Sequence, residues 1–257
     1  MRTKILWATA LASLISGLAL GLSALAGAAE PQSARPTDLR GHVPGLPASS
    51  WSVVASMPQD LYGAAAASNG TYAYAAGGYS ISSGTTLDTF YRYNPVNERW
   101  ETLLPPMPAA EAMASAVYYP TTNKIYVFGG FDPNTKAFSD ATWVFDLATS
   151  TWTSAATMPA PRASMAAAYD SANGRIYLVG GYNAGDPASA QATTWEYDPG
   201  ADTFTARASI PHAVGGAASG VIFGHLYVAG GRDASALRGP PRPARSRGTP
   251  RTSARRA

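Results

Sequence analysis

The chain has 257 residues and no cysteine, so it is long enough for a substantial core and has no disulfide bond, thiolate metal site or cysteine nucleophile. Its formal charge of +3 is unevenly distributed, because residues 232–257 contain eight Arg and one Asp, a net charge of +7, which leaves −4 for residues 1–231. A basic tail is different from a basic groove, so this charge does not predict nucleic-acid binding by the folded part.

The first 29 residues have the composition of a secretory leader. Residues 1–4 are basic, residues 5–29 are apolar or small without interruption, and residues 26–28 are small enough for a cleavage site. This pattern predicts a signal peptide at 1–29 and a secreted, periplasmic or cell-surface protein. An uncleaved membrane anchor is the alternative, because the apolar run exceeds the ~20 residues that span a bilayer. Residues 30–50, rich in Pro, Gly, Ser and Ala, predict a flexible linker.

A pattern then repeats four times with a period of about fifty residues, which is typical of the blades of a β-propeller. Glycine pairs recur at intervals of 52, 51 and 50 residues, and an aromatic residue keeps the same phase. The pairs are Gly77-Gly78, Gly129-Gly130, Gly180-Gly181 and Gly230-Gly231, and the aromatic residues are Trp51, Trp100, Trp152 and Phe204. A unit of this size cannot bury its own apolar face, so the units must stack against one another.

Four strands are expected in each complete unit. The first strands, at 63–68, 112–118, 163–169 and 214–221, consist mostly of small residues, which fit near a crowded central axis. The second strands, at 71–76, 124–128, 175–179 and 225–229, are largely apolar and end at the glycine pairs, which allow positive φ and close backbone approach. The third strand, for example 193–197, ends at a Pro turn, and the fourth carries the large aromatic residue that should fill the gap between blades.

The sequences at 125–130 (IYVFGG), 158–162 (MPAPR) and 197–199 (YDP) resemble kelch repeats, and the resemblance extends over residues 51–233. It implies an all-β fold, a kelch-type β-propeller of four-stranded antiparallel blades. Three full blades are expected at about 61–104, 113–155 and 163–208, with a partial fourth at 214–231. The ring is therefore incomplete, and residues 51–58 are a candidate closing strand.

Residues 234–257 are rich in Arg and Pro and contain no aromatic residue, which predicts a disordered tail. Two interpretations fit this segment. It is a functional basic tail that binds anionic polymers or a cell surface, or it is a truncation or frame-shift product. The second is favoured because the composition changes midway through a blade. An open arc exposes strand edges, so the isolated chain is expected either to be marginally stable or to close by association with another copy of itself or with another polypeptide.

The sequence contains no recognisable catalytic or metal-binding constellation. His42, His212 and His225 are far apart, and no nucleophile elbow, phosphate-binding loop or EF-hand loop is present. The kelch resemblance includes an enzyme class, the copper radical oxidases of the galactose oxidase type. Their cofactor is a tyrosine cross-linked to a cysteine, which cannot form in a chain without cysteine. Four carboxylates in or beside the loops after the glycine pairs could approach one another as acid and base or as calcium ligands, but solvated loop acids are the favoured interpretation; they are Asp132, Asp140, Asp186 and Asp233. We therefore expect no catalytic residue, no metal and no cofactor.

Binding residues are expected on one side of the disc, here named the loop face. The loops that follow the second strands and the segments that enter each new blade should both emerge there, because antiparallel strands alternate in direction. The candidates are Tyr79, Phe131, Tyr182 and Arg232 after the glycine pairs, and Asp60, Glu111, Arg162 and His212 between blades. Matching positions often contact the partner in kelch protein-binding modules.

The expected function is an exported binding module that recognises a protein or a glycan through the loop face, without catalysis. One alternative is a secreted sugar-modifying enzyme of the sialic acid mutarotase type, a possibility that rests on resemblance in leader and repeats. The other is a truncated, nonfunctional fragment of a longer kelch protein.

Overall fold

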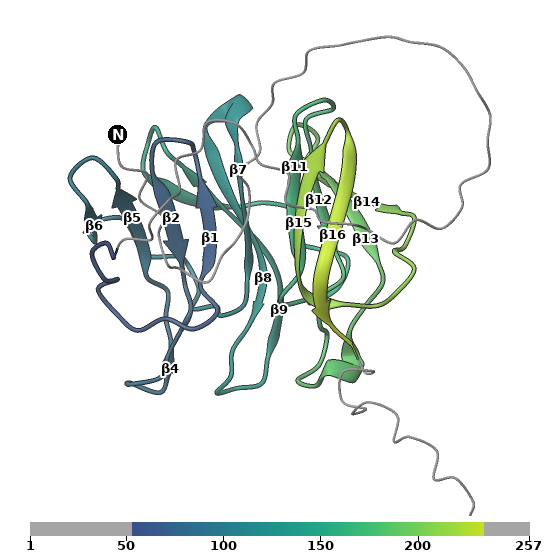
Figure 1. Cartoon of the computed structure of the whole chain (residues 1–257), viewed down its shortest axis with the longest axis horizontal. Coiled ribbons are helices and arrows are strands. Elements are labelled where there is room, and N and C mark those ends of the chain that lie inside the picture. The colour runs from purple at the N-terminus through teal and green to yellow at the C-terminus, as the bar shows by residue number, and fades with distance from the viewer. Residues whose placement is uncertain (1–52, 234–257) are drawn as a thin grey trace, which may run out of the picture.

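The computed structural model describes residues 53–233, so the predicted leader, linker and tail lie outside the described residues. The described part forms three four-stranded antiparallel sheets and a two-stranded fourth sheet, as predicted (Figure 1). The first strands of successive sheets contact one another, so the sheets diverge from a common inner edge like blades. Between residues 53 and 233, no helix is long and apolar enough to cross a membrane.

Each blade runs outward from its first strand to its last. Blade one contains β1 (Ala65–Ser68), β2 (Ala73–Ala76), β5 (Phe90–Asn94) and β6 (Arg99–Glu101), with a small hairpin of β3 (Tyr79–Ser80) and β4 (Thr85–Thr86). Blade two contains β7 (Ser115–Tyr119), β8 (Lys124–Phe131), β9 (Phe138–Asp146) and β10 (Thr151–Ser154). Blade three contains β11 (Ala166–Asp170), β12 (Arg175–Val179), β13 (Thr194–Asp198) and β14 (Thr203–Arg207), and blade four contains β15 (Gly215–Ile222) and β16 (His225–Arg232).

The candidate closing segment does not form a strand in its described part. Residues 53–58 have no strand assignment, and the segment lies beside blade one rather than along β16. The indole Nε1 of Trp100 donates to the carbonyl of Ala55 at 3.1 Å, just as that of Trp152 donates to the carbonyl of Pro105 at 3.0 Å. The segment therefore contacts blade one in the way that the chain between blades one and two contacts blade two.

Apolar cores fill the spaces between blades. Tyr74 and Phe90 of blade one pack with Ile125 and Phe145 of blade two, and a second core joins blades two and three. Trp152 closes the outer side of the first core, with its ring centroid 5.0 Å from that of Phe90. Phe204 occupies the same place in the second core, 6.3 Å from Phe128 and 4.7 Å from Tyr197. The packing thus places the recurring aromatic residue between neighbouring blades.

The glycine pairs join each blade to the next. The amide of the second glycine donates to a carbonyl of the next blade: Gly78 to Glu111 at 2.8 Å, Gly130 to Arg162 at 3.0 Å and Gly181 to Val214 at 2.8 Å. At the first glycine there is no room for a side chain. A Cβ at Gly77, Gly129 or Gly180 would lie 2.1, 2.1 or 2.2 Å from the same three carbonyl oxygens, respectively. We refer to this arrangement as the glycine latch.

A second series of backbone bonds runs along the inner edge. The amide of Met113 donates to Gly63, that of Ser164 to Met113 and that of Gly216 to Ser164, at 2.6, 2.7 and 2.8 Å. All four residues have positive φ, including the non-glycine residues Met113 (56°) and Ser164 (53°). Each inner strand therefore begins with a left-handed residue that turns its backbone toward the neighbouring blade.

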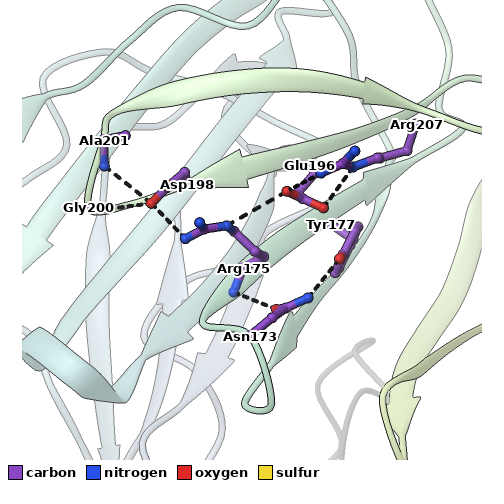
Figure 2. A network of polar contacts seen from close by, with 8 residues as sticks. All are labelled: Asn173, Arg175, Tyr177, Glu196, Asp198, Gly200, Ala201 and Arg207. Carbon is purple, nitrogen blue, oxygen red and sulfur yellow. Dashed lines mark hydrogen bonds and ion pairs between the residues drawn. The ribbon is translucent and has the colours of Figure 1, made fainter.

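The outer part of blade three carries a polar network on the face turned away from blade two (Figure 2). Arg175 forms ion pairs with Asp198 at 2.8 Å and Glu196 at 3.7 Å, and Glu196 also pairs with Arg207 at 2.8 Å. Ile176 and Tyr197, which alternate with these residues along the strands, belong to the core with blade two. The network joins β12, β13 and β14. It lies on the face of blade three that is turned toward blade four, which has only two strands in the described part.

Candidate functional site on the loop face

The two sets of loops meet at one end of the arc. Residues that follow the glycine pairs form bridges with the residues that open the inner strands: Tyr79 with Tyr62, Phe131 with Ala112, Tyr182 with Ala163, and Arg232 with Gly215. The loop face expected from strand direction is therefore present, along the lower side of the arc in Figure 1.

The loop of blade one is organised around the carboxylate of Asp60. Its oxygens accept hydrogen bonds of 2.8 Å from the hydroxyls of Ser80 and Ser82 and from the amide of Ser82. These bonds, that from the Ser82 hydroxyl first, lower the pKa of Asp60 from 3.8 to about 2, so this carboxylate is charged at neutral pH. Ile81, between the two serines, has 73% of its surface exposed. Asp60 thus holds the loop in the shape that presents Ile81.

The neighbouring loop of blade two is organised by Asp132. Its carboxylate accepts from the amide of Asn134 and the hydroxyl of Thr135, both at 2.9 Å, within its own loop. It also accepts from the hydroxyl of Thr86 in blade one at 2.5 Å. The pKa of Asp132 is lowered, and the bond from Thr86 is the largest cause. The loops of blades one and two are therefore joined into a single surface, residues 80–86 and 132–137, which we name the joined loops.

Glu111 lies beneath this surface and is only 8% exposed. Its side chain fills the space over Gly130, where a Cβ would lie 2.5 Å from Oε2. Burial raises the pKa of Glu111 from 4.5 to about 7, the charge of Asp132 adds to the effect, and a hydrogen bond with Ser139 opposes it. The carboxyl group is therefore an internal group with a pKa near neutrality, and its carbonyl belongs to the glycine latch.

Arg162, at the equivalent position of blade three, is 3% exposed. Its Nη1 donates to the carbonyl of Gly180 and to the hydroxyl of Thr193, both at 3.0 Å. The guanidinium carbon lies 4.6 Å from the centroid of the Trp195 ring. Burial lowers the pKa of Arg162, and its Nε has no hydrogen-bond partner in the described part of the chain. The geometry assigns Arg162 to packing within blade three.

The remaining candidates differ in exposure. Tyr182 is partly buried, and its hydroxyl donates to the carbonyls of Gly215 at 3.1 Å and Arg232 at 3.0 Å. Phe131 is also partly buried, with its ring 4.6 Å from that of Phe138. Tyr79 is partly buried, while Asp60, His212 and Arg232 are exposed.

Sequence reasoning placed the loops that follow the second strands on one face, but it did not predict that two of them are joined. Ile81, Thr86 and Asp132 were not among the candidate contact residues, although Ile81 is conspicuous as an apolar residue within the Ser- and Thr-rich run at 80–86. That single apolar residue was the available signal. No signal in the sequence pairs Thr86 with Asp132, which are 46 positions apart.

An open cavity of about 300 Å³ lies where the inner strands begin. It is lined by Tyr62, Gly63, Ala64, Met113, Ala114, Ser115, Ser164, Met165, Gly216 and Ala217. These residues supply one phenol, two hydroxyls and two thioethers, but no carboxylate or imidazole. Within residues 53–233, no three His, Asp or Glu side chains are grouped so that they could hold a metal ion.

Repeated four-stranded sheets with a common inner edge and loops gathered at one end define a propeller-type repeat protein. Residues 63–238 match the family model described as the KLHDC2/KLHL20/DRC7 Kelch-repeats domain. The chain belongs to this kelch-repeat family, which confirms the resemblance read from its motifs.

Known relatives agree with this assignment. Alpha-scruin of Limulus polyphemus is 26% identical over 59% of this chain and 16% of its own length, and Kelch-like protein 35 of Mus musculus is 29% identical over 57% of this chain and 23% of its own. The chain therefore spans less than a quarter of the length of either relative. The solved structure titled "Structure of YjhT" superimposes with a TM-score of 0.60 at 21% identity, covering 71% of this chain and 63% of that one, which shows a shared fold.

Proposed function

We propose that this protein is an exported binding module that engages a protein partner through the joined loops. The observation that carries the proposal is the bond from Thr86 to Asp132, which links the loops of two blades into one surface. Loops that are already ordered lose less conformational entropy when they bind a partner, so more of the contact energy contributes to affinity. Ile81 supplies an exposed apolar contact within this surface.

Membership of the kelch-repeat family supports a protein partner, because kelch-repeat proteins generally mediate protein interactions. Export is supported by the leader-like composition of residues 1–29. The cavity at the inner edge lacks a carboxylate or imidazole among its lining residues, so it offers no acid–base pair for modifying a sugar. This favours binding over the mutarotase-type alternative.

Site-specific photo-crosslinking tests the proposal. Ile81 is replaced by p-benzoylphenylalanine, the full chain is incubated with extract of its native host, and protein adducts are identified after irradiation. The control carries the same photo-crosslinker at Val96, which is 90% exposed at the end of the blade opposite the loop face. A discrete adduct at Ile81 that is absent at Val96 is expected. Identical adducts at both positions, or none at Ile81, would contradict the assignment.

A further inference from the structure

A tyrosine recurs three residues before every glycine pair. Its exposed fraction shows whether another blade packs against that face of the sheet. Tyr74 and Tyr126 are 3% and 5% exposed, because the next blade packs against them. Tyr177 of blade three, which is followed by only the two strands of blade four, is partly buried. Tyr227 occupies the same position in blade four and is 54% exposed. The face of blade four that would meet a following blade is therefore an apolar surface without cover at this residue.

The glycine latch shows the same difference. At Gly77, Gly129 and Gly180, a Cβ would meet a carbonyl oxygen of the following blade. Gly230 is the next residue in this series, with φ of +73°, and a Cβ there would have no atom within 4 Å. Blade four thus has the backbone shape of a latch with no carbonyl opposite it. What fits this surface is the start of another blade of the same kind.

Blade one of this chain presents such a start. Leu61 holds the position of Glu111, Arg162 and Val214, whose carbonyls close the three latches. Ala66 and Ala73, on the face of blade one turned away from blade two, are partly exposed, and Tyr62 at the start of the inner strand is 57% exposed. Small side chains there leave space for a large ring such as that of Tyr227.

The two surfaces also match in extent. The outer half of the same face of blade one is already covered, since Tyr91 and Tyr93 are 6% and 2% exposed. Tyr91 donates a hydrogen bond of 3.0 Å to Gln59, and the ring of Tyr93 lies 5.2 Å from that of Trp100. On the inner half of this face Ala66 and Ala73 are partly exposed, while Ala75 between them is 4% exposed, and blade four consists, in the described part, of two inner strands. A pair of inner strands would fit against that inner half.

We propose that blade four docks on blade one of a second copy of this chain, head to tail. The contact continues the interface that already joins successive blades within the chain, with Gly231 as donor and Leu61 of the second copy as acceptor of the next latch bond. Such a heterologous contact either closes a ring or adds further copies in a row. It is independent of the partner proposed for the joined loops, because Ile81 is not part of it.

Sedimentation velocity of the full chain over a range of concentrations tests this contact. The wild-type chain is expected to increase in mass with concentration. Gly230→Ala should weaken self-association by about tenfold or more, because the new methyl group would meet the incoming carbonyl. The matched control is Gly224→Ala, which has φ of +72°, equally has no atom within 4 Å of a Cβ, and lies in the turn at the other end of the same two strands.

Tyr227→Asp gives a second measurement that does not involve glycine strain, because this side chain is largely exposed in the isolated chain. It should also abolish the increase in mass, while circular dichroism remains that of the wild type. A wild-type chain that stays monomeric at all concentrations would overturn the proposal. So would equal weakening by Gly230→Ala and Gly224→Ala, or undiminished association of Tyr227→Asp.

Discussion

The hydroxyl of Thr86 in blade one donates a hydrogen bond of 2.5 Å to the carboxylate of Asp132 in blade two. This bond joins the last residue of β4 in blade one to the residue that follows β8 in blade two, so it links the two blades just beyond their glycine pairs. It adds one side-chain bond to the backbone bonds that already join blades one and two. A substitution at Thr86 could therefore change how the two loops are held together without changing the strands of either four-stranded sheet.

Thr86→Val should raise the pKa of Asp132, because the bond from Thr86 is the largest cause of its lowered value. The substitution keeps the shape of the side chain and removes the donor, and we expect a loss of stability of about 1 kcal/mol or less at this surface site. NMR titration of the Asp132 carboxyl carbon provides the measurement. Thr135→Val removes a smaller contribution and serves as the control, so an equal or larger change there would contradict the assignment.

Gly129→Ala should destabilise the chain by about 3 kcal/mol or more, because the new Cβ would lie within the contact distance of the Arg162 carbonyl. Backbone oxygen cannot move aside as the end of a flexible side chain can. Gly70→Ala is the control, since Gly70 also has positive φ (84°) but no atom within 4 Å of a Cβ. It should cost only about 1 kcal/mol. Urea unfolding of both variants separates conformational strain from the steric effect of the latch.

The buried carboxyl of Glu111 predicts a pH dependence of stability. Its pKa in the folded chain, about 7, lies above the ordinary value of 4.5, so the folded state binds more protons between these values. The stabilising contribution of the protonated group is complete below about pH 4.5 and is lost as the pH rises to about 7. The loss should be of the order of 1 to 3 kcal/mol.

Glu111→Gln removes this titration while preserving the shape of the side chain. The free energy of unfolding of this variant should therefore fall less than that of the wild type between pH 4.5 and 7. Asp60 has the opposite sign, because its pKa is lowered to about 2, and its contribution is lost only below about pH 4. Parallel curves for the wild type and Glu111→Gln above pH 4.5 would exclude the predicted role of this carboxyl.

Arg162 should matter for stability rather than for direct contact with a partner. Arg162→Ala removes the bonds to Gly180 and Thr193 and leaves a cavity beside Trp195, so we expect a loss of about 2 to 4 kcal/mol. Arg162→Met retains an apolar side chain of similar length and should cost less. Thermal unfolding of both variants tests this order. A loss of partner binding without a loss of stability in Arg162→Met would place this residue back among the contact residues.

The fold could be predicted from the sequence because its signals repeat. A glycine pair such as Gly129-Gly130 predicts little alone, but its recurrence in phase with Trp100, Trp152 and Phe204 leaves few other architectures. The positions of the strands and the existence of the loop face followed from the order and direction of these units. Repetition therefore determined what the units share.

The candidate site was less predictable because its features differ from one repeat to another. Arg162 and Glu111 hold equivalent positions, yet each is buried over a second glycine of its own blade, and the absence of a side chain at Gly130 and Gly181 provides the space. From the sequence alone, a charged residue in the segment between two blades is predicted to be exposed. The bond from Thr86 to Asp132 joins two loops that have no periodic counterpart, so no repeat pattern could predict it.

The bonds along the inner edge have an evolutionary consequence. Met113 and Ser164 form them with backbone atoms alone, in positions where Gly63 and Gly216 form the same bonds. Since no particular side chain is needed at this joint, a duplicated unit could be inserted beside any other and make the same connection at once. The joint itself would therefore not have to change when the number of modules changes, provided that the entering residue can adopt a positive φ.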